Sequence, residues 1–162
     1  MRDGFVKVAA ATLNTKVADV EHNKWEIFRL IDETIENGAK IVVFPELCIT
    51  GYTCGDLFSQ DILLSQSAKA LEEIAAYTTG KDGLFFVGLP YVVCNKLYNV
   101  AAAVCDGEVI GMVTKTFLPN YSEFYEMRQF QPGPKKADWI PYGEEEIPFG
   151  PQIYLRVKNF RI

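Results

Sequence analysis

The order of apolar segments in the first part of the chain is the feature that most limits its fold. Residues 5–13 are apolar and short, which is typical of a buried strand. Residues 41–44 form a second run, rich in β-branched side chains, that we expect to be buried on both faces. Residues 20–37 lie between these runs and carry apolar side chains at helical spacing. A strand, a helix and a strand in this order predict a crossover unit, and therefore an α/β fold.

Two helices are predicted, each with a buried stripe. For the helix over residues 20–37, Asp19 is the expected N-cap and Gly38 the expected stop. Its predicted stripe consists of Trp25, Phe28, Ile31 and Ile35. The second helix is expected over residues 61–77 and is followed by Gly80 and Gly83. Its predicted stripe consists of Leu64, Ala68, Leu71 and Ile74.

The second half of the chain is predicted to be mainly strand and loop. Residues 84–89 form a third apolar run, and residues 97–105 and 108–114 flank an Asp-Gly pair that is typical of a two-residue hairpin turn. Residues 117–143 are rich in aromatics and prolines and are expected to be irregular. Residues 153–162 alternate with a period of two up to the last residue. We therefore expect the chain to be a fragment of a longer protein, the alternative being a short final strand that simply finishes there.

Composition excludes several classes of protein. A chain of 162 residues with 49% hydrophobic and 23% charged residues is of a size and mix typical of one globular domain. The net charge of −5 argues against a nucleic-acid binder, which usually carries a basic surface. The first residues lack the apolar run of a signal peptide, and residues 5–13 are too few to cross a membrane. The chain is therefore expected to act without nucleic acid or membrane.

The cysteines do not form a metal or disulfide pattern. Cys48, Cys54, Cys94 and Cys105 lack zinc-type spacing, and His22 is the only histidine. Reduced thiols in the cytoplasm are therefore the better interpretation. Cys48 and Cys54 could be nucleophiles in principle, but neither has a histidine nearby in sequence to activate it. We expect all four to be structural.

Glu46 and Lys115 are the first candidates for chemistry. Glu46 follows the run at residues 41–44 and Lys115 follows the strand predicted at residues 108–114, so each lies at the carboxyl end of a strand. A carboxylate there could act as a general base, and a lysine could stabilise an oxyanion. The alternatives are a solvated or capping glutamate and an ordinary surface lysine. Residues 117–130 interleave aromatics with acids, which is compatible with a small-molecule pocket, a loop on the core or an oligomer contact.

Three motifs together resemble a known family. Residues 44–47 (Phe-Pro-Glu-Leu), followed by 50–52 (Thr-Gly-Tyr) and Asp56-Leu57, resemble the glutamate motif of the nitrilase, or carbon–nitrogen hydrolase, superfamily. Residues 99–102 (Asn-Val-Ala-Ala) and Gly111, leading to Lys115, are similar to its lysine region. The run Lys-Thr-Phe-Leu-Pro-Asn-Tyr-Ser-Glu-Phe-Tyr-Glu at residues 115–126 closely resembles the lysine motif of glutamine-dependent NAD synthetases, in which the amidase domain comes first.

The resemblance implies both a fold and a mechanism. The fold would be a four-layer α-β-β-α sandwich, of which residues 1–162 would be the N-terminal part. A Glu-Lys-Cys triad would hydrolyse the side-chain amide of glutamine through a thioester, with Glu46 as the general base and Lys115 stabilising the tetrahedral intermediate. The residues that fall where this family lines its glutamine pocket are Tyr52, Tyr121, Phe124 and Glu126. Glu126 also matches the supporting second glutamate of the superfamily.

One departure from the family pattern concerns the nucleophile. The superfamily places its cysteine after the strand that corresponds to residues 153–162, and none of the four cysteines matches that position. The synthetase domain, which would bind ATP, Mg and nicotinate adenine dinucleotide, is also absent from this sequence. We therefore expect the 162 residues alone to be inactive and to need no cofactor or metal.

Two further functions stay open, and the expected fragment has a physical consequence. The chain could belong to a stand-alone amidase of the same superfamily, or it could be a non-catalytic binding or assembly module. In each case a missing second half would leave the inner face of the sheet uncovered and an edge strand unpaired. We therefore predict a homo-oligomer.

Overall fold

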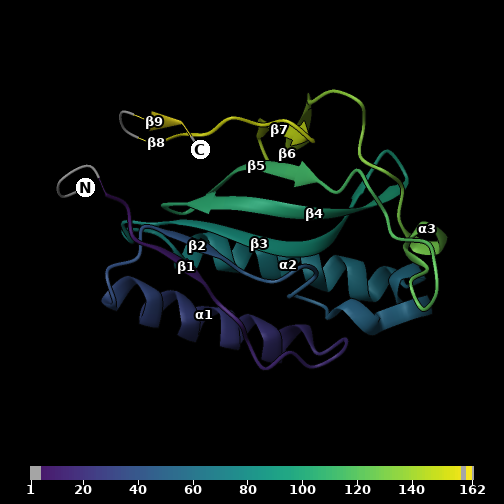
Figure 1. Ribbon diagram of the computed structural model, residues 1–162, viewed down its shortest axis with the longest axis horizontal. Coiled ribbons are helices and arrows are strands. Elements are labelled where there is room, and N and C mark those ends of the chain that lie inside the picture. The colour runs from purple at the N-terminus through teal and green to yellow at the C-terminus, as the bar shows by residue number, and fades with distance from the viewer. Residues whose placement is uncertain (1–4, 158–159, 162) are drawn as a thin grey trace.

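The computed structural model describes residues 5–157 and 160–161 and consists of helices packed on a sheet (Figure 1). The helices are α1 (Val20–Glu36), η1 (Tyr52–Ser59), α2 (Asp61–Tyr77) and α3 (Glu126–Gln129). The strands of the main sheet are β1 (Val8–Ala10), β2 (Ile41–Val43), β3 (Leu84–Val93), β4 (Lys96–Cys105), β5 (Glu108–Thr114), β6 (Asp138–Tyr142) and β7 (Glu145–Gly150). A separate short pair consists of β8 (Arg156–Val157) and β9 (Phe160–Arg161).

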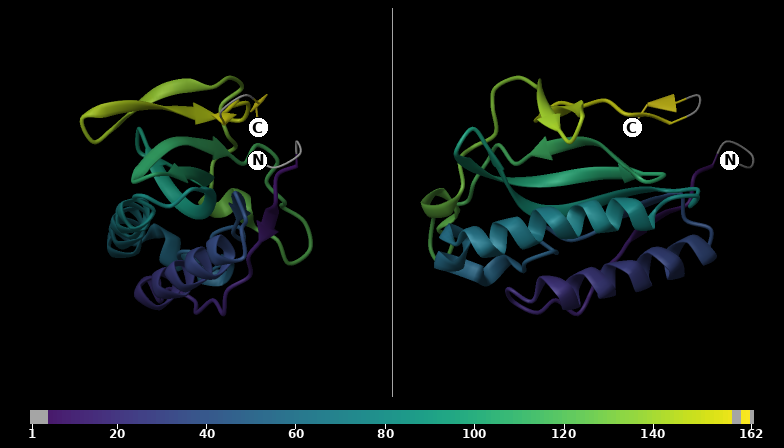
Figure 2. Two further views of the ribbon diagram at one scale, coloured as in Figure 1. Left: turned by 90° about the vertical axis from the view of Figure 1, so that its left-hand side faces the viewer. Right: turned by 180° about the vertical axis from the view of Figure 1, so that it is seen from behind.

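The main sheet is mixed and has the strand order β1-β2-β3-β4-β5-β7-β6. Its first three strands are parallel, with Val8 opposite Ile41 and Ile41 opposite Leu84. The connections through α1 and α2 place both helices on the same face (Figures 1 and 2). The predicted crossover is therefore confirmed. The two layers correspond to one helix layer and one sheet layer of the α-β-β-α sandwich that the resemblance implied.

Both predicted helices form, but their buried stripes differ from the prediction. Asp19 caps α1, since its Oδ1 accepts a hydrogen bond from His22 N at 3.0 Å, and Gly38 follows the helix with a left-handed φ of 81°. Trp25 was expected to be buried and is 60% exposed. Its ring lies at the rim, where Nε1 donates to Glu21, because the buried face of α1 is centred on Ile27 and Ile31. In α2, Leu64 and Ala68 were also expected to be buried and are only half-buried.

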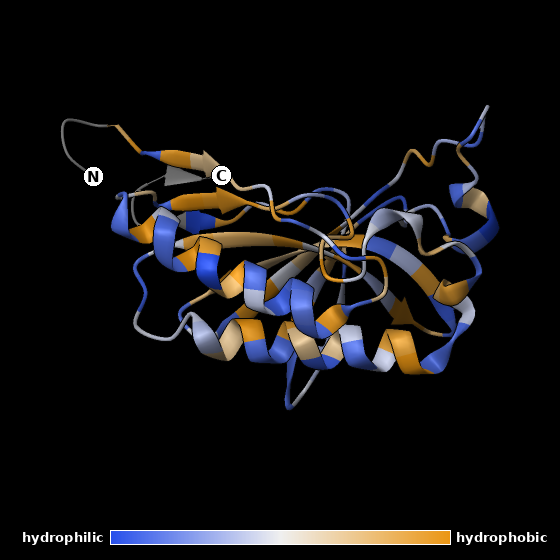
Figure 3. Cartoon of the chain, turned by 90° about the horizontal axis from the view of Figure 1, so that it is seen from below, coloured by the Kyte–Doolittle hydropathy of each residue, from blue (hydrophilic) through white to orange (hydrophobic). Residues whose placement is uncertain are grey.

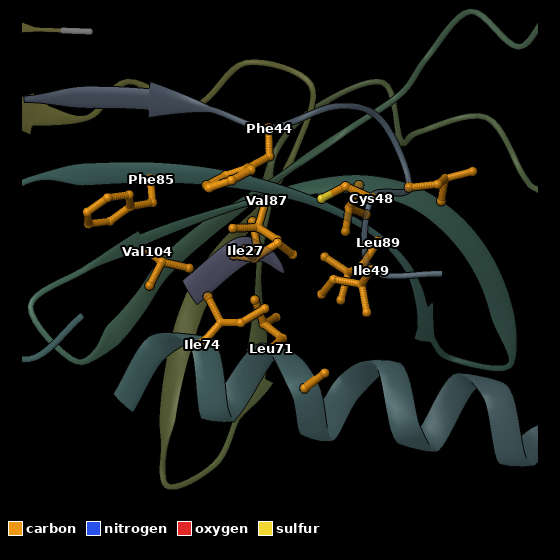
Figure 4. Packing of buried hydrophobic residues seen from close by; sticks show 14 of the residues in the cluster. Ile27, Phe44, Cys48, Ile49, Leu71, Ile74, Phe85, Val87, Leu89 and Val104 are labelled. Atoms are coloured by element: carbon orange, nitrogen blue, oxygen red, sulfur yellow. The ribbon is translucent and has the colours of Figure 1, made fainter. Parts of the chain in front are cut away.

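The core lies between the two long helices and the sheet. Phe85, Val87 and Leu89 alternate along β3 and point from one face of the strand toward Leu71 and Ile74 of α2 (Figure 4). All five of these side chains are fully buried. Side chains of this size each gain about 1.5–3 kcal/mol on full burial. In Figure 3 the helices alternate between hydrophilic and hydrophobic positions, while the strands behind them are mainly hydrophobic. The face of β3 that carries these residues therefore holds the two layers together.

The hairpin was predicted well. β4 and β5 are antiparallel and are joined at Asp106 and Gly107, which have φ values of 48° and 90°. Both values are left-handed, as a type I′ turn requires. The turn is also fixed from outside, because Asp106 Oδ1 accepts a hydrogen bond from Gly80 N at 2.7 Å.

The prediction that the first two strands are buried was wrong for one face. Val8 is 64% exposed and Val43 is 48% exposed, whereas Val42 is fully buried. The helices cover only the face that carries Val42, and within the described residues the side chains of Val8 and Val43 on the other face remain largely accessible. β1 lies at an edge of the sheet. The expectation of an uncovered sheet face and an edge strand is therefore confirmed for the described part of the chain.

Two further expectations need correction. The segment at residues 117–143 contains α3 and β6 and is not irregular throughout, because β6 finds an antiparallel partner in β7. Residues 153–155 are not in a strand, and β8 pairs only with β9. Alternating apolar residues identify a strand only when a partner strand lies alongside. The rest of the predicted final strand, at residues 158, 159 and 162, lies outside the described residues.

Within residues 5–157 and 160–161, no helix combines the length and the apolar character needed to span a bilayer.

Candidate active site

The loop after β2 carries Glu46 and is held by backbone hydrogen bonds. Leu47 O accepts hydrogen bonds from Thr50 N at 3.1 Å and from Gly51 N at 2.7 Å, so the chain turns back immediately after the glutamate. Leu47 has a φ of 51°, a left-handed conformation that costs a non-glycine residue about 1–2 kcal/mol. Its side chain is fully buried, which offsets that cost. The position of Glu46 is therefore set by a rigid loop.

Gly88 on β3 lets this loop lie directly on the sheet. A Cβ atom at Gly88 would lie 2.5 Å from Pro45 O and 2.6 Å from Leu47 N. Those separations are too short for real contacts, so the backbone on either side of Glu46 occupies the place of a side chain. Ile49 N also donates to Gly88 O at 3.2 Å. A glycine within a strand is a recognised sign of close backbone approach, so this contact could have been predicted from the sequence.

Lys115 directly follows β5, and both its backbone N–H and its backbone carbonyl form hydrogen bonds. Lys115 N donates to Asn99 O on β4 at 2.9 Å, and Lys115 O accepts from Gly133 N at 2.9 Å. The side chain turns toward the loop after β2, where Nζ donates to Glu46 Oε1 at 2.8 Å. Glu46 and Lys115, which the sequence predicts at the carboxyl ends of two strands, are thus brought into direct contact.

Glu126 is the second carboxylate on Lys115. Its Oε1 accepts hydrogen bonds from Lys115 Nζ at 2.8 Å and from Tyr52 OH at 2.7 Å. The Glu126 side chain is only 5% exposed, whereas that of Glu46 is 41% exposed. One buried carboxylate thus anchors the lysine from the inner side, and the other faces the solvent.

The pKa values of the neighbouring donors reflect this arrangement. Burial alone would lower the pKa of Lys115, but its hydrogen bonds to Glu126 and Glu46 and their negative charges outweigh burial and raise the pKa. The pKa of Tyr52 is raised by burial first and then by its hydrogen bond to Glu126. Lys115 therefore stays a cation and Tyr52 stays a donor at neutral pH, which are the states an oxyanion-stabilising group and its support need.

Asn99 is a site residue that sequence reasoning missed. The sequence motif at residues 99–102 includes Asn99 but assigns it no role. In the structure its Nδ2 donates to Glu46 Oε1 at 2.5 Å. The residue is 3% exposed and lies on β4, far from Glu46 in sequence. Because nothing in the local pattern signals a long-range hydrogen bond, only the motif itself could have marked this position.

These groups line two pockets. The first has a volume of about 310 Å³, and its lining includes Glu46, Gly88, Asn99 and Lys115. The second has a volume of about 420 Å³, and its lining includes Tyr52 and Glu126. A cavity of about 480 Å³ lies at the opposite end of the sheet, near Leu84 and Cys105, but neither Glu46 nor Lys115 lines it. The position of the acid–base groups, rather than cavity size, identifies the candidate site.

The aromatic residues predicted for the pocket are only partly brought together. Phe124 meets Tyr52 with ring centroids 6.4 Å apart and Tyr121 with centroids 5.6 Å apart, both edge to face. Tyr52 lines the second pocket, while Tyr121 is 68% exposed and lines neither pocket. The structure therefore forms an aromatic group beside the Lys115 cluster, with Tyr121 at its outer edge.

The four cysteines lie outside the pocket that contains Glu46 and Lys115. Cys48 is buried, and its Sγ donates to Gly88 O at 3.5 Å. Burial raises the pKa of the Cys48 thiol to about 12. Cys54 is buried as well and its Sγ donates to Thr50 O at 3.1 Å, whereas Cys94 is exposed and Cys105 is half-buried. None of these four described cysteines lines the pocket that contains Glu46 and Lys115.

The arrangement suits proton transfer next to a fixed cation. Oε1 of Glu46 accepts from both Lys115 and Asn99, and no described residue makes a hydrogen bond with Oε2. A carboxylate with one oxygen anchored and the other free can receive a proton from a nucleophile, while the ammonium stabilises an oxyanion formed nearby. Among the described residues, no group of His, Cys, Asp and Glu side chains is placed to hold a metal ion.

Comparisons with known proteins identify the family to which the chain belongs. Residues 7–153 match the family described as carbon-nitrogen hydrolase. The glutamine-dependent NAD(+) synthetase of Mycobacterium leprae is 34% identical over 150 residues, which cover 93% of this chain and 22% of that protein. The synthetase of the same name from Aquifex aeolicus is 43% identical over 129 residues, which cover 80% of this chain and 22% of that protein.

A solved structure is similar over nearly the whole chain. The crystal structure of a glutamine-dependent NAD(+) synthetase from Cytophaga hutchinsonii superposes with a TM-score of 0.90 and 34% identity. The match covers 96% of this chain and 27% of the other. The present chain thus spans about a quarter of the length of these relatives.

Proposed function

Because this chain belongs to the carbon–nitrogen hydrolase family, we propose that it is the first part of the glutamine-hydrolysing domain of a glutamine-dependent NAD synthetase. The relatives from Mycobacterium leprae and Aquifex aeolicus bear that name, and so does the protein of the similar solved structure. Since the chain spans about a quarter of those proteins, the activity belongs to the whole protein and not to these residues alone.

The single observation that carries this proposal is the contact between Lys115 Nζ and Glu46 Oε1 at 2.8 Å, in one pocket at the end of the sheet. A general base and a fixed cation that share a pocket are the two groups that attack on an amide needs besides a nucleophile. The nucleophile is proposed to be a cysteine outside the 162 residues, because Cys48 and Cys54 are buried away from this pocket.

In the proposed reaction Glu46 takes the proton of the cysteine thiol, and the thiolate attacks the side-chain amide carbon of glutamine. Lys115 stabilises the oxyanion of the tetrahedral intermediate. As the intermediate collapses, the C–N bond breaks and Glu46 returns the proton to the departing ammonia. A water molecule then gives a proton to Glu46 and attacks the thioester. The C–S bond breaks, glutamate is released, and Glu46 returns the proton to the cysteine sulfur, which restores the thiol.

The remaining site residues would position these groups. Glu126 holds Lys115 from the buried side and is itself held by Tyr52, so the ammonium stays fixed as charge develops. Tyr52 lines the second pocket and would contact the carbon chain of glutamine. Phe124 packs edge to face on Tyr52 and Tyr121 on Phe124, so these two rings would support Tyr52 from outside the pockets. With these assignments the amide of glutamine would lie at Lys115 in the first pocket, and its carbon chain would extend toward the pocket lined by Tyr52.

The whole protein would use the ammonia to convert nicotinate adenine dinucleotide to NAD. ATP and Mg belong to that step and would be bound by a separate synthetase domain, and no residue described here is assigned to them. The whole protein is proposed to act in the cytoplasm as a homo-oligomer.

The test compares nitrogen sources for the complete protein. With ATP, Mg and nicotinate adenine dinucleotide, NAD should form from glutamine and, independently, from ammonium. Formation of NAD from ammonium but not from glutamine would contradict the role proposed for this chain. If neither yields NAD but another small amide is hydrolysed, the protein is a stand-alone amidase of the family. If no amide is hydrolysed at all, this domain is a binding module.

A further inference from the structure

We propose that Asn99 is a positioning residue that orients Glu46 as the general base and couples it to Lys115. This inference rests on the proposed function, because it assigns Asn99 a role in the reaction of that site. It goes further in assigning a role to a residue on β4 whose side chain contacts the proposed general base.

Asn99 contacts both residues of the proposed pair, one with its side chain and one with its backbone. Its Nδ2 donates to Glu46 Oε1 at 2.5 Å, and its backbone O accepts from Lys115 N at 2.9 Å. The residue is 3% exposed and lies within the ladders of β4, where Pro90 is its partner on β3. A single rigid point in the sheet therefore fixes the distance between the loop after β2 and the end of β5.

The side-chain contact decides which oxygen of Glu46 is available. Asn99 and Lys115 both donate to Oε1, which leaves Oε2 as the oxygen without a hydrogen bond among the described residues. The Glu46 side chain is 41% exposed, so without these anchors it could rotate into solvent. A neutral amide donor holds the ionised carboxylate without neutralising its charge, and it remains a donor at every pH at which the protein is folded.

Other charged and titratable groups face Glu46, and each must be considered in a pH experiment. Lys115 approaches from the end of β5 and Glu126 from α3. Tyr52 approaches from η1, and the charges of Glu126 and Glu46 and the nearby Tyr121 contribute to the rise of its pKa. Because the pKa values of Lys115 and Tyr52 are both raised, these two groups keep their charge states through neutral pH. A change in the acidic limb of the pH profile therefore does not come from Lys115 or Tyr52.

The experiment measures glutamine hydrolysis by the complete protein as a function of pH, for wild type and two variants of Asn99. Asn99→Leu removes the donor. We expect kcat to fall by about 10–100-fold with KM changed by less than about threefold, and the acidic limb to move to higher pH. Asn99→Asp keeps the shape and donates only while it is protonated. The ratio of its activity to that of wild type at the same pH should therefore be highest at acid pH and should fall as the pH rises.

Asn23→Leu is the matched control for loss of a buried amide. Asn23 is fully buried, and its side chain bonds only to backbone atoms of Lys16 and Ile49. This variant should lower the unfolding midpoint without moving the acidic limb. If Asn99→Leu does not fold, Asn99→Asp carries the test, because it preserves the volume of the side chain.

The outcomes separate this inference from the function on which it rests. A wild-type protein that does not hydrolyse glutamine would contradict the proposed function. A wild-type protein that does, together with Asn99 variants whose pH profiles run parallel to it, would overturn the role of Asn99 alone. Equal shifts of the acidic limb in the Asn99 and Asn23 variants would also overturn it, because the effect would then be one of general stability.

Discussion

At the scale of single residues, the candidate site depends on backbone contacts as much as on charge. The turn that presents Glu46 combines a left-handed leucine, Leu47, with the absence of a side chain at Gly88. Neither residue touches the reacting atoms. Both fix where the carboxylate lies relative to Lys115, and displacements of about 1 Å in such sites typically cost about 100-fold in rate.

Replacing Gly88 by alanine should therefore displace the glutamate loop. The new Cβ would lie 2.5 Å from Pro45 O, so the loop must move or the strand must shift. We expect glutamine hydrolysis by the complete protein to fall by about 100-fold and stability by about 1–3 kcal/mol. Gly143→Ala is the control, because a Cβ there meets nothing within 4 Å although φ is 63°. That variant should cost about 1–2 kcal/mol and leave activity unchanged. Equal activity in both variants would refute the positioning role of Gly88.

The buried thiol of Cys48 should make the fold sensitive to alkaline pH. Burial raises its pKa from 9.0 to about 12 in the folded state, so the folded chain holds a proton that the unfolded chain releases. The stabilisation is complete below pH 9 and is lost as the pH rises toward 12, at up to about 1.4 kcal/mol per pH unit. Urea denaturation between pH 7 and pH 10.5 measures this loss.

A cysteine variant isolates that effect. Cys48→Ala should be less stable than wild type at pH 7, by about 1–2 kcal/mol, yet its stability should fall less steeply above pH 9. Cys94→Ala removes an exposed thiol and should keep the wild-type slope. If the slopes of wild type and Cys48→Ala coincide, ionisation of Cys48 does not govern the alkaline limit.

At the scale of elements, the β4–β5 hairpin is locked to the end of α2 by its turn. Thr78 is fully buried, and its Oγ1 accepts from Gly107 N at 3.0 Å while donating to Ala75 O at 2.7 Å. Asp106 accepts from Gly80 N on the same loop. The hairpin that ends in Lys115 is thus tied at its far end to the helix layer.

Thr78→Val should test this connection. It keeps the shape of the side chain but leaves Gly107 N without its acceptor, which should cost about 1–3 kcal/mol of unfolding free energy. Thr79→Val is the matched control, because Thr79 is exposed and its Oγ1 bonds only to Ala76 O. Chemical denaturation of the two variants should separate them by at least about 1 kcal/mol. Equal stabilities would show that the turn is not held by Thr78.

The elements also show what the sequence can and cannot predict. The range of α2 and the turn of the hairpin follow from local patterns, because helix periodicity and the Asp-Gly turn are properties of neighbouring residues. The exposure of Trp25 and the strand β6 cannot be predicted from local patterns, because both depend on which distant segment packs alongside. The same holds within the site, where Glu46 and Lys115 were predicted from strand ends, while the hydrogen bond from Asn99 was not.

At the scale of the whole molecule, the described residues form a sheet with one covered and one open face. The helices α1 and α2 cover one face (Figure 2), and the exposed side chains of Val8 and Val43 lie on the other. β1 is at the edge of the same sheet. Apolar side chains on an open face next to an edge strand promote association between chains.

The isolated 162-residue chain is therefore expected to self-associate through this face. Val8→Lys should weaken association by about tenfold in sedimentation velocity measured over a range of concentrations. Ile62→Lys is the control, since Ile62 and Val8 are both 64% exposed but Ile62 lies on α2. A wild-type chain that remains monomeric at all concentrations would contradict the prediction. So would a pair of variants that weaken association equally, since the helix layer would then contribute as much as the open face.

Glu46 and Lys115 are proposed to act as one catalytic unit, because their side chains form a hydrogen bond in one pocket. The most direct measurement is kcat for glutamine hydrolysis by the complete protein carrying Glu46→Gln, Lys115→Met or both, with Glu108→Gln, an exposed glutamate on β5, as control. Each single variant should lose about 10³-fold, the double variant should lose little more, and the control should match wild type. Single variants within about tenfold of wild type, or losses that multiply in the double variant, would contradict the account.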